Sequence, residues 1–117
     1  MVNRMVKYQP TLDRTLSALS DPTRRDILER LSAGPASISQ LALPIGISLP
    51  GVMKHIRILE EAKLVATEKR GRVRECHLVP GEMDEVTDWV ATFRQRWERR
   101  LDRLEAYIEE QQEGARP

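Results

Sequence analysis

The side chains best suited to chemistry lie between residues 48 and 74. A predicted helix over residues 48–62 begins at Ser48, whose hydroxyl can accept hydrogen bonds from the backbone N–H groups of a first helical turn. Its outer face carries small residues first and cations later, and these are Ser48, Pro50, Gly51, Lys54, His55 and Arg57. A helix with such a face can approach a polyanion closely. We therefore predict that it reads DNA, with Lys54 reaching either a guanine edge or a phosphate.

A second group of cations surrounds Gly71, in a predicted hairpin over residues 64–79. Two stretches that alternate in polarity and are rich in β-forming residues flank this turn. The cations are Lys69, Arg70, Arg72 and Arg74. An arginine near a hairpin tip can enter the DNA minor groove, where it responds to groove width and potential rather than to base identity. The alternative is that these cations have no DNA contact and only keep an exposed hairpin tip soluble.

Three shorter helices are expected to position this predicted DNA-reading helix. Apolar residues at helical spacing predict helices over 11–20 and 22–32, and a third that begins after Ser37 or Ser39 and is stopped by Pro44 and Gly46. A turn of about four residues then leads to Ser48. This order of helix, tight turn and helix is the helix-turn-helix arrangement, in which the second helix enters the major groove.

The junction before the second helix is a further candidate site. Asp21 followed by Pro22 is a helix start signal, with the aspartate as N-cap. The turn presents backbone N–H groups together with the cation Arg24, so it can clamp a DNA phosphate. The alternative is that the same residues only cap the helix.

A long helix is predicted over residues 82–112. Apolar residues recur along it at helical spacing and form one stripe, which Trp89 widens at its start. The members of the stripe are Val86, Trp89, Val90, Phe93, Trp97, Leu101, Leu104 and Ile108. A helix of about 30 residues is about 45 Å long, more than a small domain can cover. A second copy of the chain is the expected partner, and a pocket for a hydrophobic effector is the alternative.

Length and charge agree with one small domain that has a localised cationic surface. The chain has 117 residues and a formal net charge of +1. Residues 1–47 carry a net charge of +2, residues 48–79 carry +3 and residues 80–117 carry −4. The cations thus concentrate around the predicted DNA-reading helix and hairpin. We expect an N-terminal arm over 1–10, a DNA-binding domain over 11–80, a dimerisation helix over 81–112 and a tail over 113–117.

The chain contains one cysteine, Cys76, so an intramolecular disulfide is excluded. Cys76 and His77 are neighbours on a predicted strand, so their side chains point to opposite faces and cannot share one metal ion. We expect Cys76 to be a buried core thiol, with redox sensing as the alternative. We find no catalytic constellation and predict no enzyme activity, metal or cofactor. Without an apolar leader or a membrane-spanning run, a soluble cytoplasmic protein is expected.

The sequence resembles the ArsR/SmtB family of bacterial transcriptional regulators. The residues that carry the resemblance are Leu19–Leu28, Ser48–Val65 and Arg70–Arg72, and the likeness extends over about residues 12–110. Metal-sensing members have a Cys-x-Cys element in the third helix and histidines on the last helix. This chain has no cysteine at 40–43 and no histidine on its last helix, so it resembles a subgroup without metal sites.

The resemblance implies a fold and a mode of action. The fold is winged helix-turn-helix, mainly α with a small β-hairpin, with about five helices and a two-stranded wing. Members are dimeric repressors that pair through their first and last helices, which here adds Leu12 and Leu16 to the stripe on the last helix. Their recognition helices enter successive major grooves, and binding of an inducer loosens DNA contact.

The function expected from the sequence is sequence-specific binding of double-stranded DNA by a homodimeric repressor. Its operator is palindromic, with half-sites about one helical turn apart. Two alternatives stay open at this point. One is a winged-helix protein-interaction module, and the other is a redox-responsive or small-molecule-responsive sensor of the same fold. The amino-acid sequence does not identify the operator, the regulated genes or any effector.

Overall fold

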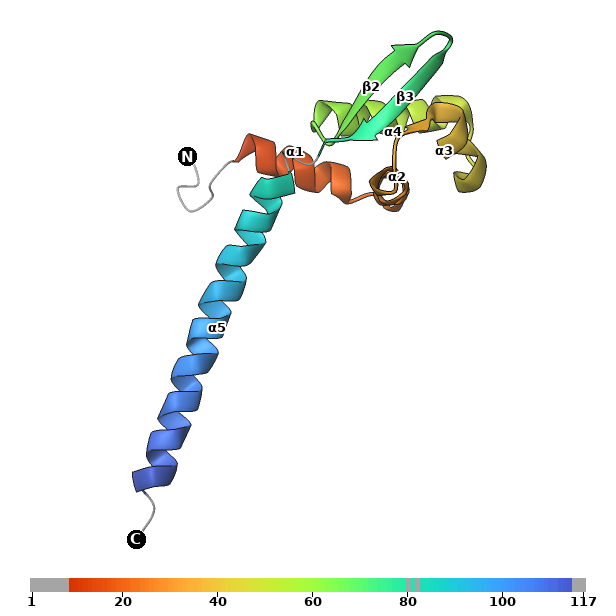
Figure 1. Ribbon diagram of the computed structural model, residues 1–117. Helices are drawn as coiled ribbons and strands as arrows, with labels where there is room; N and C mark the ends of the chain where they lie inside the picture. The colour runs from red at the N-terminus through yellow and green to blue at the C-terminus, as the bar shows by residue number, and fades with distance from the viewer. Residues whose placement is uncertain (1–8, 80, 82, 115–117) are drawn as a thin grey trace. The chain divides into compact units, whose positions relative to one another are not determined.

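The computed structural model describes residues 9–79, 81 and 83–114. Most of the predicted N-terminal arm, and residues 115–117 of the predicted tail, lie outside the described residues. The chain divides into two compact units, residues 1–86 and residues 87–117. The elements in chain order are α1 (Pro10–Leu19), α2 (Pro22–Ser32), β1 (Ala36–Ser37), α3 (Ile38–Ile45), α4 (Leu49–Glu61), β2 (Val65–Arg70), β3 (Val73–Leu78) and α5 (Met83–Gly114) (Figure 1).

Side-chain caps start three of the helices, as the sequence predicts. The Asp21 carboxylate accepts from the backbone N–H of Arg24 at 3.0 Å and caps α2. Ser37 and Gln40 form a capping box at the start of α3. The Ser48 hydroxyl accepts from the backbone N–H of Gly51 at 3.2 Å and caps α4. Each cap fixes where a helix begins, and the last one fixes the first turn of the predicted DNA-reading helix.

The end of α3 differs in detail from the prediction. Pro44 was expected to help stop this helix, but it lies within it, and α3 continues to Ile45. A proline removes one backbone donor from a helix, and in α3 this loss falls one position from the C-terminal end. Gly46 ends the helix instead. Its φ of 79° is left-handed, and its N–H donates to the carbonyl oxygen of Ala42 at 2.9 Å.

The predicted hairpin is confirmed, and it belongs to a larger sheet than predicted. Strands β2 and β3 pair antiparallel from Val65 opposite Leu78 to Arg70 opposite Val73. Gly71, with φ of 64°, occupies the first position of the two-residue turn, as a type II′ hairpin requires. The β1 strand adds a third strand on the other side of β3, with Ala36 opposite Cys76. The predicted two-stranded wing is thus present, and the sheet has a third strand that was not predicted, because a two-residue strand is too short to show alternation.

The core of the first unit joins α1, α2, α3, α4 and the sheet. Residues Val52, Ile56 and Leu59, the inner stripe of α4, are essentially inaccessible to solvent. They pack with buried side chains of the other elements, which are Ala18, Ile27, Leu28, Leu31, Leu41, Ala42, Ala62, Leu64, Val65 and Cys76. Burial of this stripe fixes the rotation of α4 about its axis. As a result, the opposite face of α4 is directed to solvent.

The long helix predicted from residue 82 to residue 112 is confirmed as α5, which ends two residues later. Its stripe of apolar side chains is exposed in the single chain. Within it, the rings of Trp89 and Phe93 meet edge to face, with centroids 4.8 Å apart. No helix in the described part of the chain is long and apolar enough to cross a membrane.

Candidate nucleic-acid interface

The outer face of α4 presents most of the residues predicted to meet DNA. Ser48, Pro50, Lys54 and Arg57 are exposed, and Gly51 is half-buried. Gly51 has a packing role as well. A side chain there would place its Cβ 3.3 Å from the Ser48 hydroxyl oxygen and 3.6 Å from a methyl group of Ile47. Because Gly51 has no side chain, the Ser48 cap and Ile47 can lie close to the backbone of the first turn of α4.

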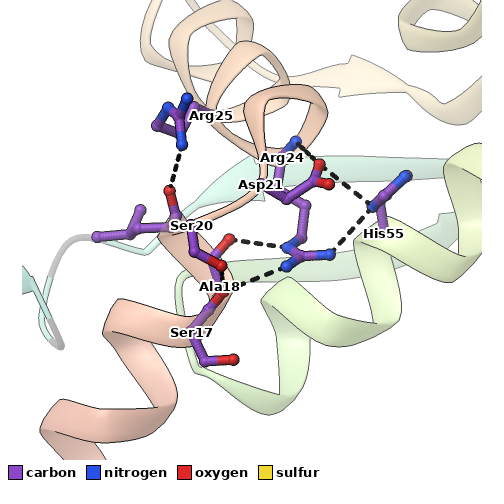
Figure 2. Close-up of polar contacts among 8 residues, drawn as sticks. Ser17, Ala18, Ser20, Asp21, Arg24, Arg25 and His55 are labelled. Atoms are coloured by element: carbon purple, nitrogen blue, oxygen red, sulfur yellow. Dashed lines mark hydrogen bonds and ion pairs between the residues drawn. The ribbon is translucent and has the colours of Figure 1, made fainter.

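His55 lies at the edge of this face and contacts residues from the α1–α2 junction and the first turn of α2. Its Nδ1 lies 3.3 Å from Nη1 of Arg24 and 3.8 Å from a carboxylate oxygen of Asp21. Figure 2 shows both contacts reaching the same nitrogen of the ring, while the other ring nitrogen points away from them. The α4 helix is thus tied to the junction between α1 and α2, through a contact between residues 31 positions apart.

The guanidinium group of Arg24 contacts acceptors within the chain. Nε donates to the carbonyl oxygen of Ala18 at 2.7 Å, and Nη2 donates to that of Ser17 at 3.2 Å. Both carbonyl groups belong to the last turn of α1, where helix carbonyls lack the full set of intrahelical partners, and that of Ser17 also accepts from the N–H and hydroxyl of Ser20. The backbone N–H of Arg24 donates to the Asp21 carboxylate, so these residues cap α2, and the predicted phosphate clamp at this turn stays a prediction. Nε, Nη1 and Nη2 each have one partner within the chain, which leaves two of the five guanidinium N–H groups for a DNA phosphate.

Asp21 is an anion at neutral pH. The hydrogen bond from the backbone N–H of Arg24 lowers the pKa of its carboxyl group below the ordinary value, although partial desolvation opposes this shift. The charge of the Arg24 guanidinium lowers it further, as does His55 when its ring is protonated. The carboxylate therefore offers a fixed negative charge next to the histidine of α4.

The cations of the wing, which we define as β2, β3 and the turn between them, divide into two kinds. Lys69, Arg70 and Arg72 are exposed near the tip. Arg70 lies 3.7 Å from Glu68 and 3.9 Å from Glu75, but such exposed pairs are weak and leave it available to a stronger partner. Arg74 instead donates to the Thr67 hydroxyl at 2.8 Å.

Arg74 faces the space between the wing and α4. Thr67, its partner, in turn donates to the carboxylate of Glu60 on α4 at 3.4 Å. Two hollows of about 380 and 230 Å³ adjoin here, and both are lined by Ile38, Met53 and Arg74. The larger one is also bordered by the exposed apolar residues Leu49 and Val73. Apolar side chains, the cations Arg57, Arg72 and Arg74, and the carboxylate of Glu60 thus line the space between α4 and the wing.

Cys76 lies in the core, as predicted. Its side chain has no exposed surface, and burial raises the pKa of the thiol to about 11. At neutral pH it is therefore a protonated, enclosed thiol, and such thiols are unreactive. This environment counts against the alternative of redox sensing. Among the residues that the structure describes, no group of three His, Cys, Asp or Glu side chains could hold a metal ion.

The predicted dimer contacts fall into two groups. Most stripe residues of α5 are exposed, with Trp97 at 58% the most exposed member of the predicted set. Val86 is half-buried. On α1, Leu12 is already buried within the single chain and Leu16 is half-buried. Leu12 therefore has little surface left for a partner, whereas α5 has a continuous apolar face.

Comparison with known proteins defines the class. The family described as "Helix-turn-helix domain" matches residues 19–68, from the end of α1 to the wing. A crystal structure of ArsR family transcriptional regulator RHA00566 is 44% identical, with a TM-score of 0.73, and covers 80% of this chain and 97% of that one. An ArsR-like transcriptional regulator from Rhodococcus sp. RHA1 is 29% identical, with a TM-score of 0.72, covering 86% and 92%.

Two curated regulators are also similar. HTH-type transcriptional regulator Rv2034 of Mycobacterium tuberculosis is 41% identical over 68 residues, which are 58% of this chain and 64% of that protein. Transcriptional repressor SdpR of Bacillus subtilis is 28% identical over 82 residues, which are 70% and 91% of the two chains.

The fold and the site define a winged helix-turn-helix transcriptional regulator rather than an enzyme. The chain belongs to the ArsR family of such regulators, as its sequence resemblance led us to expect.

Proposed function

We propose that the chain is a homodimeric transcriptional repressor that binds an operator with two-fold symmetry. In each protomer, α4 lies in the major groove and the wing follows the adjacent minor groove. The observation that carries this proposal is the orientation of α4. Its apolar stripe is completely buried, so its small N-terminal residues and later cations face outward on the same unit as the exposed cations of the wing.

The proposed contacts follow from this placement. In the major groove they are Ser48, Pro50, Gly51, Lys54, His55 and Arg57, and on the wing they are Lys69, Arg70, Arg72 and Arg74. Two of the residues on α4, Pro50 and Gly51, have no side chain that can hydrogen-bond to bases. Leu49 and Pro50 can instead touch thymine methyl groups. Part of the specificity should therefore come from DNA shape, read through the wing cations.

Dimerisation is supported by the exposed apolar stripe of α5 and by one structural neighbour. That neighbour, a Mycobacterium bovis domain that is 19% identical, is described as a homodimeric winged helix-turn-helix DNA-binding domain. Repression is supported by SdpR, which is described as a transcriptional repressor. Two copies of α4, held at a fixed spacing, would convert a weak contact with one half-site into binding of a whole operator.

Fluorescence anisotropy with DNA from upstream of the protein's own gene tests this function. Affinity should fall steeply and linearly with the logarithm of salt concentration, because phosphate contacts release counterions. Lys54→Ala should weaken binding about tenfold. Arg30→Ala is a matched control, because Arg30 lies on α2 and pairs with Asp26 at 3.3 Å, outside the proposed contacts. Absence of salt-dependent binding to any duplex tested would refute the proposal.

A further inference from the structure

The contact between Arg24 and His55 constrains the chemistry of the recognition helix. Nη1 of Arg24 is 3.3 Å from Nδ1 of His55, and the ring is largely enclosed, with 22% of its side-chain surface exposed. A guanidinium group has only N–H donors and stays protonated in proteins. The nitrogen that faces it must therefore act as an acceptor, which means that Nδ1 carries no proton.

A neutral imidazole with a bare Nδ1 has its single proton on Nε2. We infer that Arg24 is a positioning residue that holds His55 in the Nε2–H tautomer, so that His55 offers DNA one N–H donor in a fixed direction. The statement that this donor is offered to DNA rests on the proposed function. Figure 2 agrees with it, because the second ring nitrogen points away from Arg24 and Asp21.

The guanidinium is well placed to impose this state because it is itself anchored. Its Nε and Nη2 donate to two carbonyl oxygens at the end of α1, those of Ala18 and Ser17. Only Nη1 is then directed to α4. The Asp21 carboxylate lies 3.8 Å from the same ring nitrogen, too far for a hydrogen bond. The junction of α1 and α2 thus determines which proton the recognition helix presents.

This state limits what His55 can recognise. A lone Nε2–H donor matches acceptors such as a phosphate oxygen, guanine O6 or the N7 of a purine, and it is mismatched with the amino groups of cytosine and adenine. If the ring takes up a second proton, Nδ1–H faces the cation Arg24 and the anion Asp21 at once. The partner of Nδ1 would then change from Arg24 to Asp21, and the direction of the ring would no longer be fixed by Arg24.

Nuclear magnetic resonance of the free protein tests the tautomer directly. Two-bond correlations between ring nitrogens and carbon-bound protons distinguish the tautomers, and they should be recorded near pH 8.5, where an ordinary imidazole is neutral. The chain has only two histidines, so His77→Gln assigns the signals. We expect the Nε2–H form in the wild type and a mixture of both forms in Arg24→Ala.

Arg25→Ala is the matched control for this measurement. Arg25 donates to the carbonyl oxygen of Leu19 at 2.8 Å, from the same junction of α1 and α2. Its loss should disturb the junction but leave the His55 spectrum unchanged. A wild-type spectrum of the Nδ1–H form would overturn the inference, as would an unchanged spectrum in a folded Arg24→Ala protein. This experiment uses no DNA, so its result does not depend on the proposed function.

Amide substitutions test the role of the fixed donor on DNA. The amide of Gln reaches about as far as Nε2 of His, whereas the amide of Asn reaches about as far as Nδ1. His55→Gln should bind within about threefold of the wild type, and His55→Asn should bind about tenfold more weakly, the cost of one lost hydrogen bond. In an Arg24→Ala background the two variants should differ less.

Equal binding by His55→Asn and the wild type would overturn the role of His55 as a DNA donor. If the wild type binds no duplex at all, the proposed function fails and that role falls with it. The tautomer is then decided by the resonance experiment alone. The two failures are therefore distinguishable.

Discussion

The backbone N–H of Leu64 donates to the carbonyl oxygen of Leu59 at 2.9 Å, and both side chains are completely buried. One residue earlier, the N–H of Lys63 donates to the carbonyl oxygen of Glu60, also at 2.9 Å. Together these bonds form a Schellman motif at the end of α4. The motif turns the chain from α4 into β2, and it thereby joins the recognition helix to the wing.

Lys63 occupies the position of this motif that glycine usually takes. Its φ is 58°, and it is the only described non-glycine residue with a positive φ. A side chain in this conformation costs about 1 kcal/mol or more. We expect Lys63→Gly to raise the free energy of unfolding by about 0.5–1 kcal/mol, because the relief of this strain exceeds the extra chain entropy that glycine loses on folding. Urea denaturation followed by circular dichroism measures the change.

Lys63→Ala is the control for that substitution, because alanine keeps the Cβ that causes the strain and should leave stability close to the wild type. If the glycine variant is no more stable than the alanine variant, the left-handed conformation of Lys63 does not store the free energy that we assign to it.

Arg72 tests the contribution of the wing. It is the second residue of the turn and is exposed, where a cation can enter the minor groove. Arg72→Ala should weaken binding to all duplexes by a similar factor and reduce the salt slope by about one unit, because one phosphate-associated cation is lost. Titrations at several salt concentrations measure the slope. An unchanged slope would remove Arg72 from the interface.

Cys76 should not react with thiol reagents in the folded protein. Burial raises the pKa of its thiol from 9.0 to about 11, so below pH 9 almost no thiolate forms, and the side chain has no exposed surface. Iodoacetamide should therefore label the chain in urea but not in buffer, as intact mass measures. Rapid labelling of the native protein would restore the redox alternative.

The same pKa shift predicts how stability depends on pH. Between pH 9 and 11 the unfolded state loses the proton of Cys76 while the folded state keeps it. The free energy of unfolding should therefore fall as pH rises through this interval. A Cys76→Ala variant should lack this component, and comparison of the two denaturation profiles isolates it.

The sequence predicts those parts of the fold that depend on neighbouring residues. Asp21, Ser37 and Ser48 cap the helices that follow them, because a cap needs only a side chain within three residues of the N–H group that it accepts from. Gly71 marks the hairpin turn for the same reason. The inner stripe of α4 was predictable from its spacing, since burial of one face follows directly from helical periodicity.

Contacts between distant residues were not predictable in this way. The pairing of Ala36 with Cys76 and the contact of Arg24 with His55 each join segments more than 30 positions apart. No periodicity or spacing relates such residues, because the tertiary fold alone brings them together. For this reason the sequence predicts a DNA contact for Arg24 from its charge, but it does not predict the contacts that three of its guanidinium nitrogens make within the chain.

The apolar stripe of α5 gives the last prediction. Leu101 is 44% exposed in the single chain, and if a second copy covers it, a carboxylate there would be buried without a partner, at a cost of several kcal/mol. Leu101→Glu should therefore reduce the mass in solution from twice the 13.5 kDa of one chain to a single chain. Light scattering after size-exclusion chromatography measures the mass, and operator affinity should fall with it.

Gln95→Glu is the matched control, because it makes the same change of charge on the same helix at an exposed position outside the stripe. It should remain a dimer, which separates the effect of burial from that of added negative charge. Should Leu101→Glu also remain a dimer with unchanged operator affinity, another surface joins the two copies. The spacing between their recognition helices would then be set elsewhere than on α5.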